Sequence, residues 1–190
     1  MVPDYPLDEA LATLRNSGLV LFPTDTLWSI GTDATDPVSV LRLLRLYQSV
    51  HSPEPIEILV DDLAMLKHYV PRLHPKLETL LLYHAQPLTI QVEQTRHLPV
   101  QLTETPFEVA FRLVRDAYTQ QMIQELGKPI ASMFATFDGE RLPRHFGNIN
   151  SDVVSAADLV TGLDISSPLP AQPSVMIRLS EDDELVFVRE

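Results

Sequence analysis

Hydroxyl side chains and arginines stand beside apolar runs at several separated points of this chain. They are Thr24, Thr26, Thr89, Arg112, Ser132, Ser174 and Arg189. Hydroxyls hold small polar ligands through hydrogen bonds, and the guanidinium of arginine binds carboxylates and phosphates. In α/β proteins such ligands lie outside the carboxyl ends of the strands. These residue types at these places therefore predict a site for a small polar ligand.

The clearest pattern is the apolar run Leu19–Phe22 followed by Pro23-Thr-Asp-Thr26. The run predicts a buried strand, and the proline ends it because proline cannot donate to a sheet ladder. The three polar side chains would then contact a ligand at the end of the strand. A hydrogen-bonded Asx or ST turn without any ligand explains the same residues. The pattern alone leaves both interpretations open.

Arg112 lies in Ala110-Phe-Arg-Leu113, an otherwise apolar run. A buried arginine requires an anionic partner or several hydrogen-bond acceptors. That partner is either one of the 26 acidic side chains of the chain or a bound ligand. The sequence does not decide between these two possibilities.

Predicted strands and helices alternate along the chain. The strands cover 19–22, 56–60, 88–92, 107–113, 129–135, 159–160, 175–179 and 185–189. The helices cover 8–15, 37 to about 51, 61–69, 76–83 and 116–126, with a short one near residue 151. This order predicts an α/β fold with a mixed parallel and antiparallel sheet. The length of the chain favours a single domain over residues 1–190, without an additional C-terminal domain.

The composition narrows the classes of partner. A net charge of −12 with only 14 Lys and Arg residues disfavours binding to nucleic acids. The absence of cysteine excludes disulfides and thiolate metal sites. No apolar run is long enough to span a bilayer, and residues 1–6 lack the features of a signal peptide. We therefore expect a cytoplasmic protein without a membrane partner.

Several familiar catalytic patterns do not occur in the sequence. Neither of the glycine-rich phosphate-binding motifs, the P-loop and G-x-G-x-x-G, is present in the sequence. The six histidines do not form a zinc-binding pair. The carboxylate clusters Asp61-Asp62 and Glu181-Asp-Asp183 are interpreted as a helix cap and a solvated turn. We therefore assign no catalytic residue, no metal ligand and no intrinsic cofactor from the sequence.

Seven segments, in order, resemble those of the YrdC-like family, the L-threonylcarbamoyladenylate synthases. They are Phe22-Pro-Thr-Asp-Thr26, His74-Pro-Lys-Leu-Glu78, Gln86-Pro-Leu-Thr89, Val109-Ala-Phe-Arg112, Gly127-Lys-Pro-Ile130, Ser174-Val-Met176 and Arg189-Glu190. The resemblance implies a twisted sheet curled around a cavity, with flanking helices. It also implies condensation of threonine, bicarbonate and ATP, which enters with magnesium, into threonylcarbamoyl-AMP for tRNA modification. Members are also described as double-stranded RNA-binding proteins and translation factors.

The resemblance implies a role for each candidate site residue. Thr24 or Thr26, together with Arg112 and Ser174, would hold the threonine end of the reaction. Ser132 and Arg189 would face the nucleotide. These six residues are the binding residues that we expect from the sequence.

The chain departs from the family pattern at positions that matter for the chemistry. The Lys-x-Arg motif that contacts the ATP phosphates becomes Gln48-Ser-Val50, and the Ser-Ala-Asn turn becomes Phe134-Ala-Thr136. Glu108 stands where the family often has threonine. A charge-assisted hydrogen bond contributes about 1.5–3 kcal/mol, so loss of both cations removes roughly 3–6 kcal/mol of polyphosphate affinity. Arg42 and Arg45 are the candidates that could compensate.

Three hypotheses follow from these observations. The first is a divergent relative that keeps a cavity for a small ligand or nucleotide but has impaired adenylation chemistry, with Trp28, Met133 and Phe134 making the cavity more apolar. The second is an active synthase with relocated arginines. The third is a module that binds double-stranded RNA, which the net charge disfavours.

Overall fold

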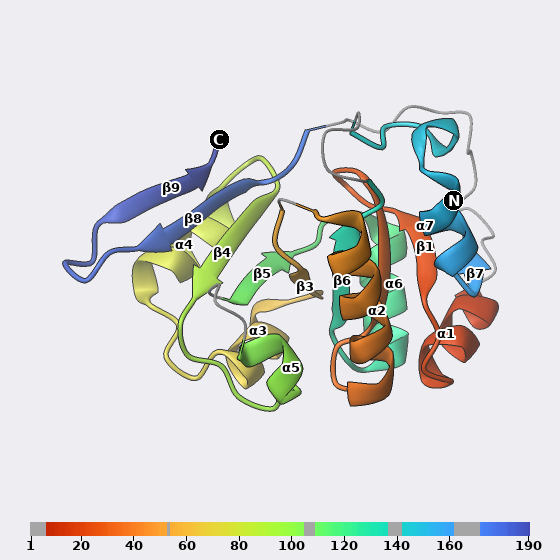
Figure 1. The fold of residues 1–190 in the computed structure, drawn as a ribbon. Helices are drawn as coiled ribbons and strands as arrows, with labels where there is room; N and C mark the ends of the chain where they lie inside the picture. The colour runs from red at the N-terminus through yellow and green to blue at the C-terminus, as the bar shows by residue number, and fades with distance from the viewer. Residues whose placement is uncertain (1–6, 53, 105–108, 137–141, 162–171) are drawn as a thin grey trace.

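The computed structural model describes residues 7–52, 54–104, 109–136, 142–161 and 172–190. Its strands form one nine-stranded mixed sheet in the order β7-β1-β2-β6-β3-β5-β4-β8-β9 (Figure 1). The strands are β1 (Val20–Pro23), β2 (Trp28–Asp33), β3 (Glu57–Val60), β4 (Leu88–Val92), β5 (Val109–Leu113), β6 (Ile130–Phe134), β7 (Leu159–Val160), β8 (Val175–Leu179) and β9 (Leu185–Arg189). The pairs β1–β7, β3–β5 and β4–β8 are parallel, and the other neighbours are antiparallel. The predicted mixed α/β sheet is therefore confirmed.

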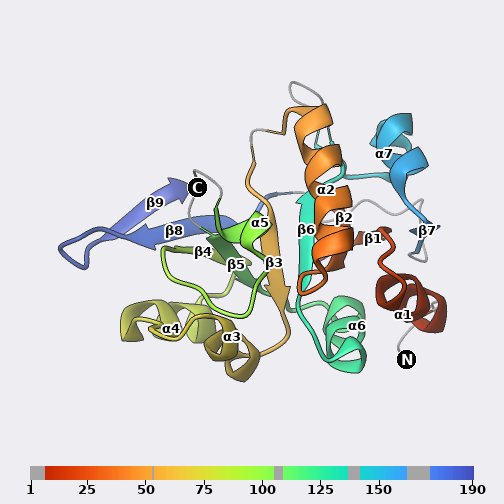
Figure 2. The same ribbon diagram turned by 60° about the horizontal axis from the view of Figure 1, so that its bottom comes forward.

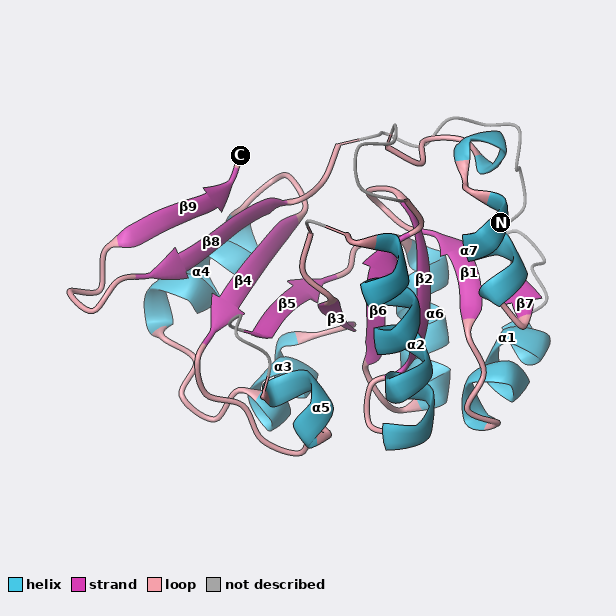
Figure 3. Cartoon of the chain, in the orientation of Figure 1, coloured by secondary structure: helices cyan, strands magenta, loops and turns pink. Residues whose placement is uncertain are grey.

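Helices flank this sheet along its length (Figure 3). They are α1 (Leu7–Arg15), α2 (Pro37–Val50), α3 (Leu63–Tyr69), α4 (Pro75–Tyr83), α5 (Val100–Thr103), α6 (Ala117–Leu126) and α7 (Ser151–Ala156), with a 3₁₀ turn at Phe146–Asn148. Within the described ranges, no helix is long and apolar enough to cross a membrane.

Two apolar clusters cover the two faces of the sheet. Helices α2, α3, α4 and α5 pack with alternate strand residues such as Leu21, Ile58 and Phe111. Helices α1 and α6 pack with the intervening residues, including Phe22 and Leu59. Figure 2 shows α2 on one side of the sheet and α1 and α6 on the other. The alternation follows from the two-residue repeat of a strand, which sends successive side chains to opposite faces.

Local sequence signals explain where several helices begin and end. The side chain of Asp36 accepts hydrogen bonds from the amides of Val38 and Ser39 and caps α2, as the Asp36-Pro37 pair predicts. Asp116 caps α6 in the same manner, and Gly127 ends that helix with φ of 72°. A residue in this left-handed conformation is best a glycine, because it has no Cβ to clash.

The structure differs from the sequence-based expectation at two elements. Strand β2 was not predicted, because Trp28–Asp33 mixes apolar and small polar residues that are all buried and so shows no alternation. The short helix α5 was also not predicted. Residues 107 and 108 of the predicted strand 107–113 lie outside the described residues.

Candidate functional site

The register of the sheet gathers three of the candidate residues and one further polar residue, Glu57, onto one face. Ser132 on β6 lies opposite Glu57 on β3, and Thr89 on β4 lies opposite Arg112 on β5. Arg112 in turn lies opposite Leu59, two residues along β3 from Glu57. Directly paired residues and residues two apart point to the same face of a sheet. Residues that are far apart in the sequence therefore form one buried polar cluster.

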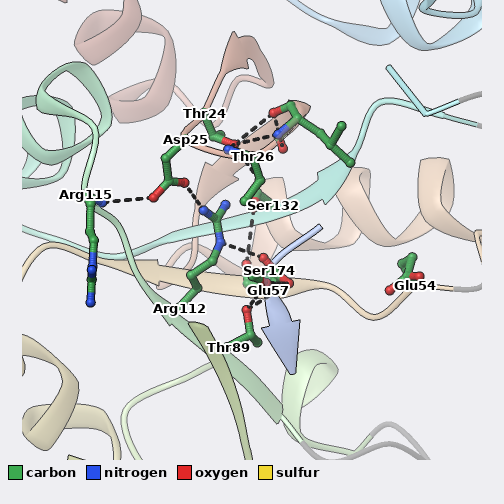
Figure 4. Close-up of polar contacts among 12 residues, drawn as sticks. Thr24, Asp25, Thr26, Glu54, Glu57, Thr89, Arg112, Arg115, Ser132 and Ser174 are labelled. Atoms are coloured by element: carbon green, nitrogen blue, oxygen red, sulfur yellow. Dashed lines mark hydrogen bonds and ion pairs between the residues drawn. The ribbon is translucent and has the colours of Figure 1, made fainter. Parts of the chain in front are cut away.

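Arg112 is the centre of this cluster and is fully buried. Its Nε donates to Oε2 of Glu57 at 2.9 Å, and its Nη1 donates to the carboxylate of Asp25 (Figure 4). Burial would lower the pKa of Arg112, but the adjacent Asp25 and Glu57 carboxylates outweigh burial and raise it. Arg112 is therefore held as a cation by carboxylates of its own chain, which is one of the two possibilities that the sequence left open.

Arg189 approaches the same carboxylate from strand β9. Its Nη2 donates to Oε1 of Glu57 at 2.9 Å and to Oγ of Ser174 at 2.8 Å, and its Nη1 pairs with Glu54. Its Cζ also lies 5.5 Å from the ring centroid of Phe134, within the range of a cation–π contact. The second predicted arginine is therefore also paired inside the protein.

Glu57 joins the two arginines and is the residue that sequence reasoning missed. Its side chain is 4% exposed and also accepts hydrogen bonds from Oγ1 of Thr89 at 3.1 Å and Oγ of Ser174 at 3.4 Å. Burial would raise the pKa of Glu57, but Arg112 and Arg189 hold the pKa below its ordinary value. A charged residue inside the apolar run Ile56–Val60 was the signal that could have identified it.

The hydroxyl residues occupy different places around this cluster. The Oγ atoms of Thr89 and Ser174 lie 2.6 Å apart, and Oγ of Ser132 donates to the Glu57 carbonyl at 3.5 Å. Oγ1 of Thr24 lies 2.9 Å from Oγ1 of Thr26 and donates to the Leu27 carbonyl. The Thr24–Leu27 segment is thus the hydrogen-bonded ST turn that the sequence allowed, and it directs Asp25 toward Arg112. The binding roles of these hydroxyls stay predictions.

A cavity of about 670 Å³ adjoins the cluster at Asp25. Its other described lining residues are Gln86, Pro87, Leu142, Arg144, Gln172, Pro173, Val175 and Glu190. Two of these lining residues directly follow cluster residues in the sequence: Val175 follows Ser174, and Glu190 follows Arg189. Arg144 is the one cation among the described lining residues, and sequence reasoning did not single it out. The volume lies within the range of small-molecule sites.

The structure does not bring the two compensating candidates to this cluster. Arg42 forms an ion pair with Asp158 at 2.9 Å and donates to the Ser17 carbonyl, and it lines a different cavity of about 330 Å³. Arg45 is exposed on α2. At the positions aligned with Lys-x-Arg, Gln48 is exposed and Val50 is buried.

Two other residues named in the sequence analysis do not line the cavity as it is described. Trp28 and Met133 belong to the apolar core rather than to the lining of the cavity near Asp25. Glu108 lies outside the described residues. Within the described ranges, no group of three His, Cys, Asp or Glu residues is placed to hold a metal ion.

The fold and the site define an α/β protein with a paired arginine cluster beside a cavity, and comparison with known proteins identifies the family. The Sua5/YciO/YrdC family model, described as "Telomere recombination", matches residues 12–190. The chain belongs to this family. A threonylcarbamoyl-AMP synthase of Xanthomonas euvesicatoria is 25% identical over 181 residues, which cover 92% of this chain and 93% of that protein. This relationship is that of a distant homologue.

Two solved structures share the fold. Sua5 of P. abyssi, in complex with L-threonine, has a TM-score of 0.81 and 22% identity over 96% of this chain. The matched region is 53% of that protein, so this chain spans about half of its length. E. coli YciO has a TM-score of 0.76 and 21% identity, with coverage of 97% of this chain and 88% of that protein. At these identities the structures establish the common fold.

Proposed function

We propose that this chain is a divergent family member that binds a small ligand in the cavity at Asp25 and has impaired adenylation chemistry. The observation that carries the proposal is the pairing of both cluster arginines with carboxylates of the chain itself. Three carboxylates, from Asp25, Glu54 and Glu57, pair with two guanidiniums, from Arg112 and Arg189. The cluster therefore offers no excess positive charge to a polyphosphate.

Adenylyl transfer depends on cations that neutralise the negative charge developing on the phosphates. The Gln48-Ser-Val50 segment supplies none, and Arg42 is paired with Asp158 away from the cluster. Arg144 remains as a cation at the cavity, where it could contact one anionic group of a ligand. A single exposed arginine replaces only part of the interaction that a Lys-x-Arg motif would provide.

The ligand class follows from the family and the cavity. Because the P. abyssi relative binds L-threonine, an amino acid or a related small polar molecule is the first candidate for this cavity, with any carboxylate at Arg144 and not at the two cluster arginines. The resemblance also implies ATP with magnesium, but the neutralised cluster weighs against ATP as the ligand of this site. Residues 1–190 would act as a single domain. Binding of double-stranded RNA stays a prediction of the resemblance, and the net charge of −12 weighs against it.

Release of pyrophosphate tests this proposal. The purified chain is incubated with ATP, magnesium, threonine and bicarbonate, and the threonylcarbamoyl-AMP synthase of Klebsiella pneumoniae, a 23% identical relative, serves as the positive control. We expect pyrophosphate release at least about a hundredfold slower than that of the control, given two missing charge contacts. Release at a comparable rate would show instead an active synthase with relocated cations.

A further inference from the structure

The Glu57 carboxylate occupies the place between two arginines where an anionic group would bind. Arg112 meets it through Nε at 2.9 Å and Arg189 through Nη2 at 2.9 Å, while Thr89 and Ser174 donate from their hydroxyls. Two guanidiniums and two hydroxyls are the donors that proteins use to bind a carboxylate or a phosphate. All four donors converge here on a side chain of the protein.

The burial of the arrangement makes this occupancy stable. Arg112 is fully buried and the Glu57 side chain is 4% exposed, so neither charge can be solvated by rotation toward water. A buried charge without a partner is strongly unfavourable. An incoming anion would have to displace Glu57 and leave that carboxylate buried without its partners.

One donor of the cluster has no acceptor among the described residues. Among the described residues, Nη2 of Arg112 is a buried nitrogen without a hydrogen-bond partner. Its neighbouring groups on the guanidinium already face Asp25 and Glu57 (Figure 4). With the charge satisfied, this donor suits an acceptor oxygen that is uncharged, such as a carbonyl or a hydroxyl.

We propose that Glu57 is a built-in anion that determines the specificity of this site: it excludes carboxylate and phosphate groups from the two arginines and leaves the cluster open to uncharged acceptors. The inference rests on the proposed function, because it names the group that limits the ligand class of the same site. It requires no covalent step and no additional cofactor.

Chemical rescue of a Glu57→Ala variant tests the inference. Removal of the carboxylate opens a void beside two guanidiniums that each keep one other carboxylate, Asp25 for Arg112 and Glu54 for Arg189. Formate is small enough to refill this void. We expect the melting temperature of Glu57→Ala, followed by Trp28 fluorescence, to rise by at least about 3 °C more than that of the wild type as sodium formate replaces sodium chloride at constant ionic strength.

Asp33→Ala is the matched control. The Asp33 side chain is also 4% exposed and pairs with a cation, Lys128 at 2.7 Å, but that lysine is 48% exposed. Its ammonium becomes hydrated when the carboxylate is removed, so formate should stabilise this variant no more than the wild type. Equal responses of Glu57→Ala, Asp33→Ala and the wild type to formate would overturn the inference.

A second variant covers the case in which Glu57→Ala folds neither with nor without formate. Glu57→Gln keeps the side-chain volume and one acceptor oxygen but removes the charge. Inorganic pyrophosphate should then raise its melting temperature by at least about 3 °C more than that of the wild type. An identical shift in both proteins would overturn the inference. Synthase activity of the wild type, by contrast, would contradict the proposed function and not the response of these variants.

Discussion

Nε of Arg112 lies 2.9 Å from Oε2 of Glu57, and the two residues are 55 positions apart in the sequence. Both side chains are buried, so the pair connects strands β3 and β5 inside the protein. Buried pairs of this kind add little net stability compared with well-packed apolar residues, but loss of one partner is strongly destabilising. Substitution of either residue alone should therefore destabilise the protein more than substitution of both would suggest.

Arg112→Met should destabilise the protein by about 3–5 kcal/mol, because it leaves the Asp25 carboxylate without its cation and Glu57 with Arg189 alone. The double variant Arg112→Met/Glu57→Leu should lose less than the sum of the two single variants. Urea unfolding of all four proteins of the cycle, followed by Trp28 fluorescence, gives the coupling energy. We expect that energy to exceed about 1 kcal/mol. Additive effects of the two substitutions would show that the pair does not couple energetically.

The pH dependence of stability should reveal the charge of Glu57. The folded protein holds the pKa of Glu57 below its ordinary value of 4.5, so the carboxylate binds fewer protons in the folded state than in the unfolded state. The contribution of the Glu57 carboxylate to the free energy of unfolding is present above about pH 5 and is lost as the pH falls through the folded-state pKa. The difference in unfolding free energy between the wild type and Glu57→Gln should therefore be largest at about pH 6 and should shrink toward about pH 3.

The titration of Asp116 also changes the free energy of unfolding with pH, and the comparison of the two proteins removes its effect. Burial raises its pKa, so its titration changes stability in the opposite direction, but it does so equally in the wild type and in Glu57→Gln. The difference between the two proteins isolates Glu57. A difference that stays constant over this pH range would contradict the assignment of a buried ionised Glu57.

Arg189 should anchor the edge strand β9. The apolar residues Leu185, Phe187 and Val188 are 42%, 58% and 46% exposed, so they contribute little to holding this strand in place. Arg189→Ala removes the bonds to Glu57, Ser174 and Glu54. Charge-assisted bonds contribute about 1.5–3 kcal/mol each, so amide exchange in β8 and β9 should become at least about tenfold faster.

Exchange in the central strands supplies the internal control. Amides of β2 and β6 lie in the middle of the sheet and should exchange at the wild-type rate if Arg189→Ala acts only at the edge. Faster exchange in every strand would indicate global destabilisation rather than release of β9.

The sequence predicted local features well because their causes are local. Strand β4 has the bounds 88–92 that alternation predicts, and Asp36 caps α2 as its side chain and the following proline indicate. The candidates Arg112, Ser132, Ser174 and Arg189 lie together in the structure, whereas Arg42 lies elsewhere, paired with Asp158. The grouping was predicted from the resemblance of seven ordered segments to the family, because no local pattern relates residues that are distant in the sequence.

The role of Glu57 could not be predicted in the same way. Any of the 26 acidic residues could have been the partner of Arg112, and only the strand register decides which one is. The order β6-β3-β5-β4 depends on long-range pairing, which the periodicity of single strands does not encode. For the same reason, the sequence could not show that the arginines are already neutralised.

Calorimetric titration of the wild-type protein with ATP and magnesium tests the central claim most directly. Both cluster arginines are paired with carboxylates, and the Gln48-Ser-Val50 segment carries no cation. With roughly 3–6 kcal/mol of charge contacts absent, we predict a Kd weaker than about 1 mM. Saturable binding at the same site with a Kd tighter than about 1 mM would contradict the account.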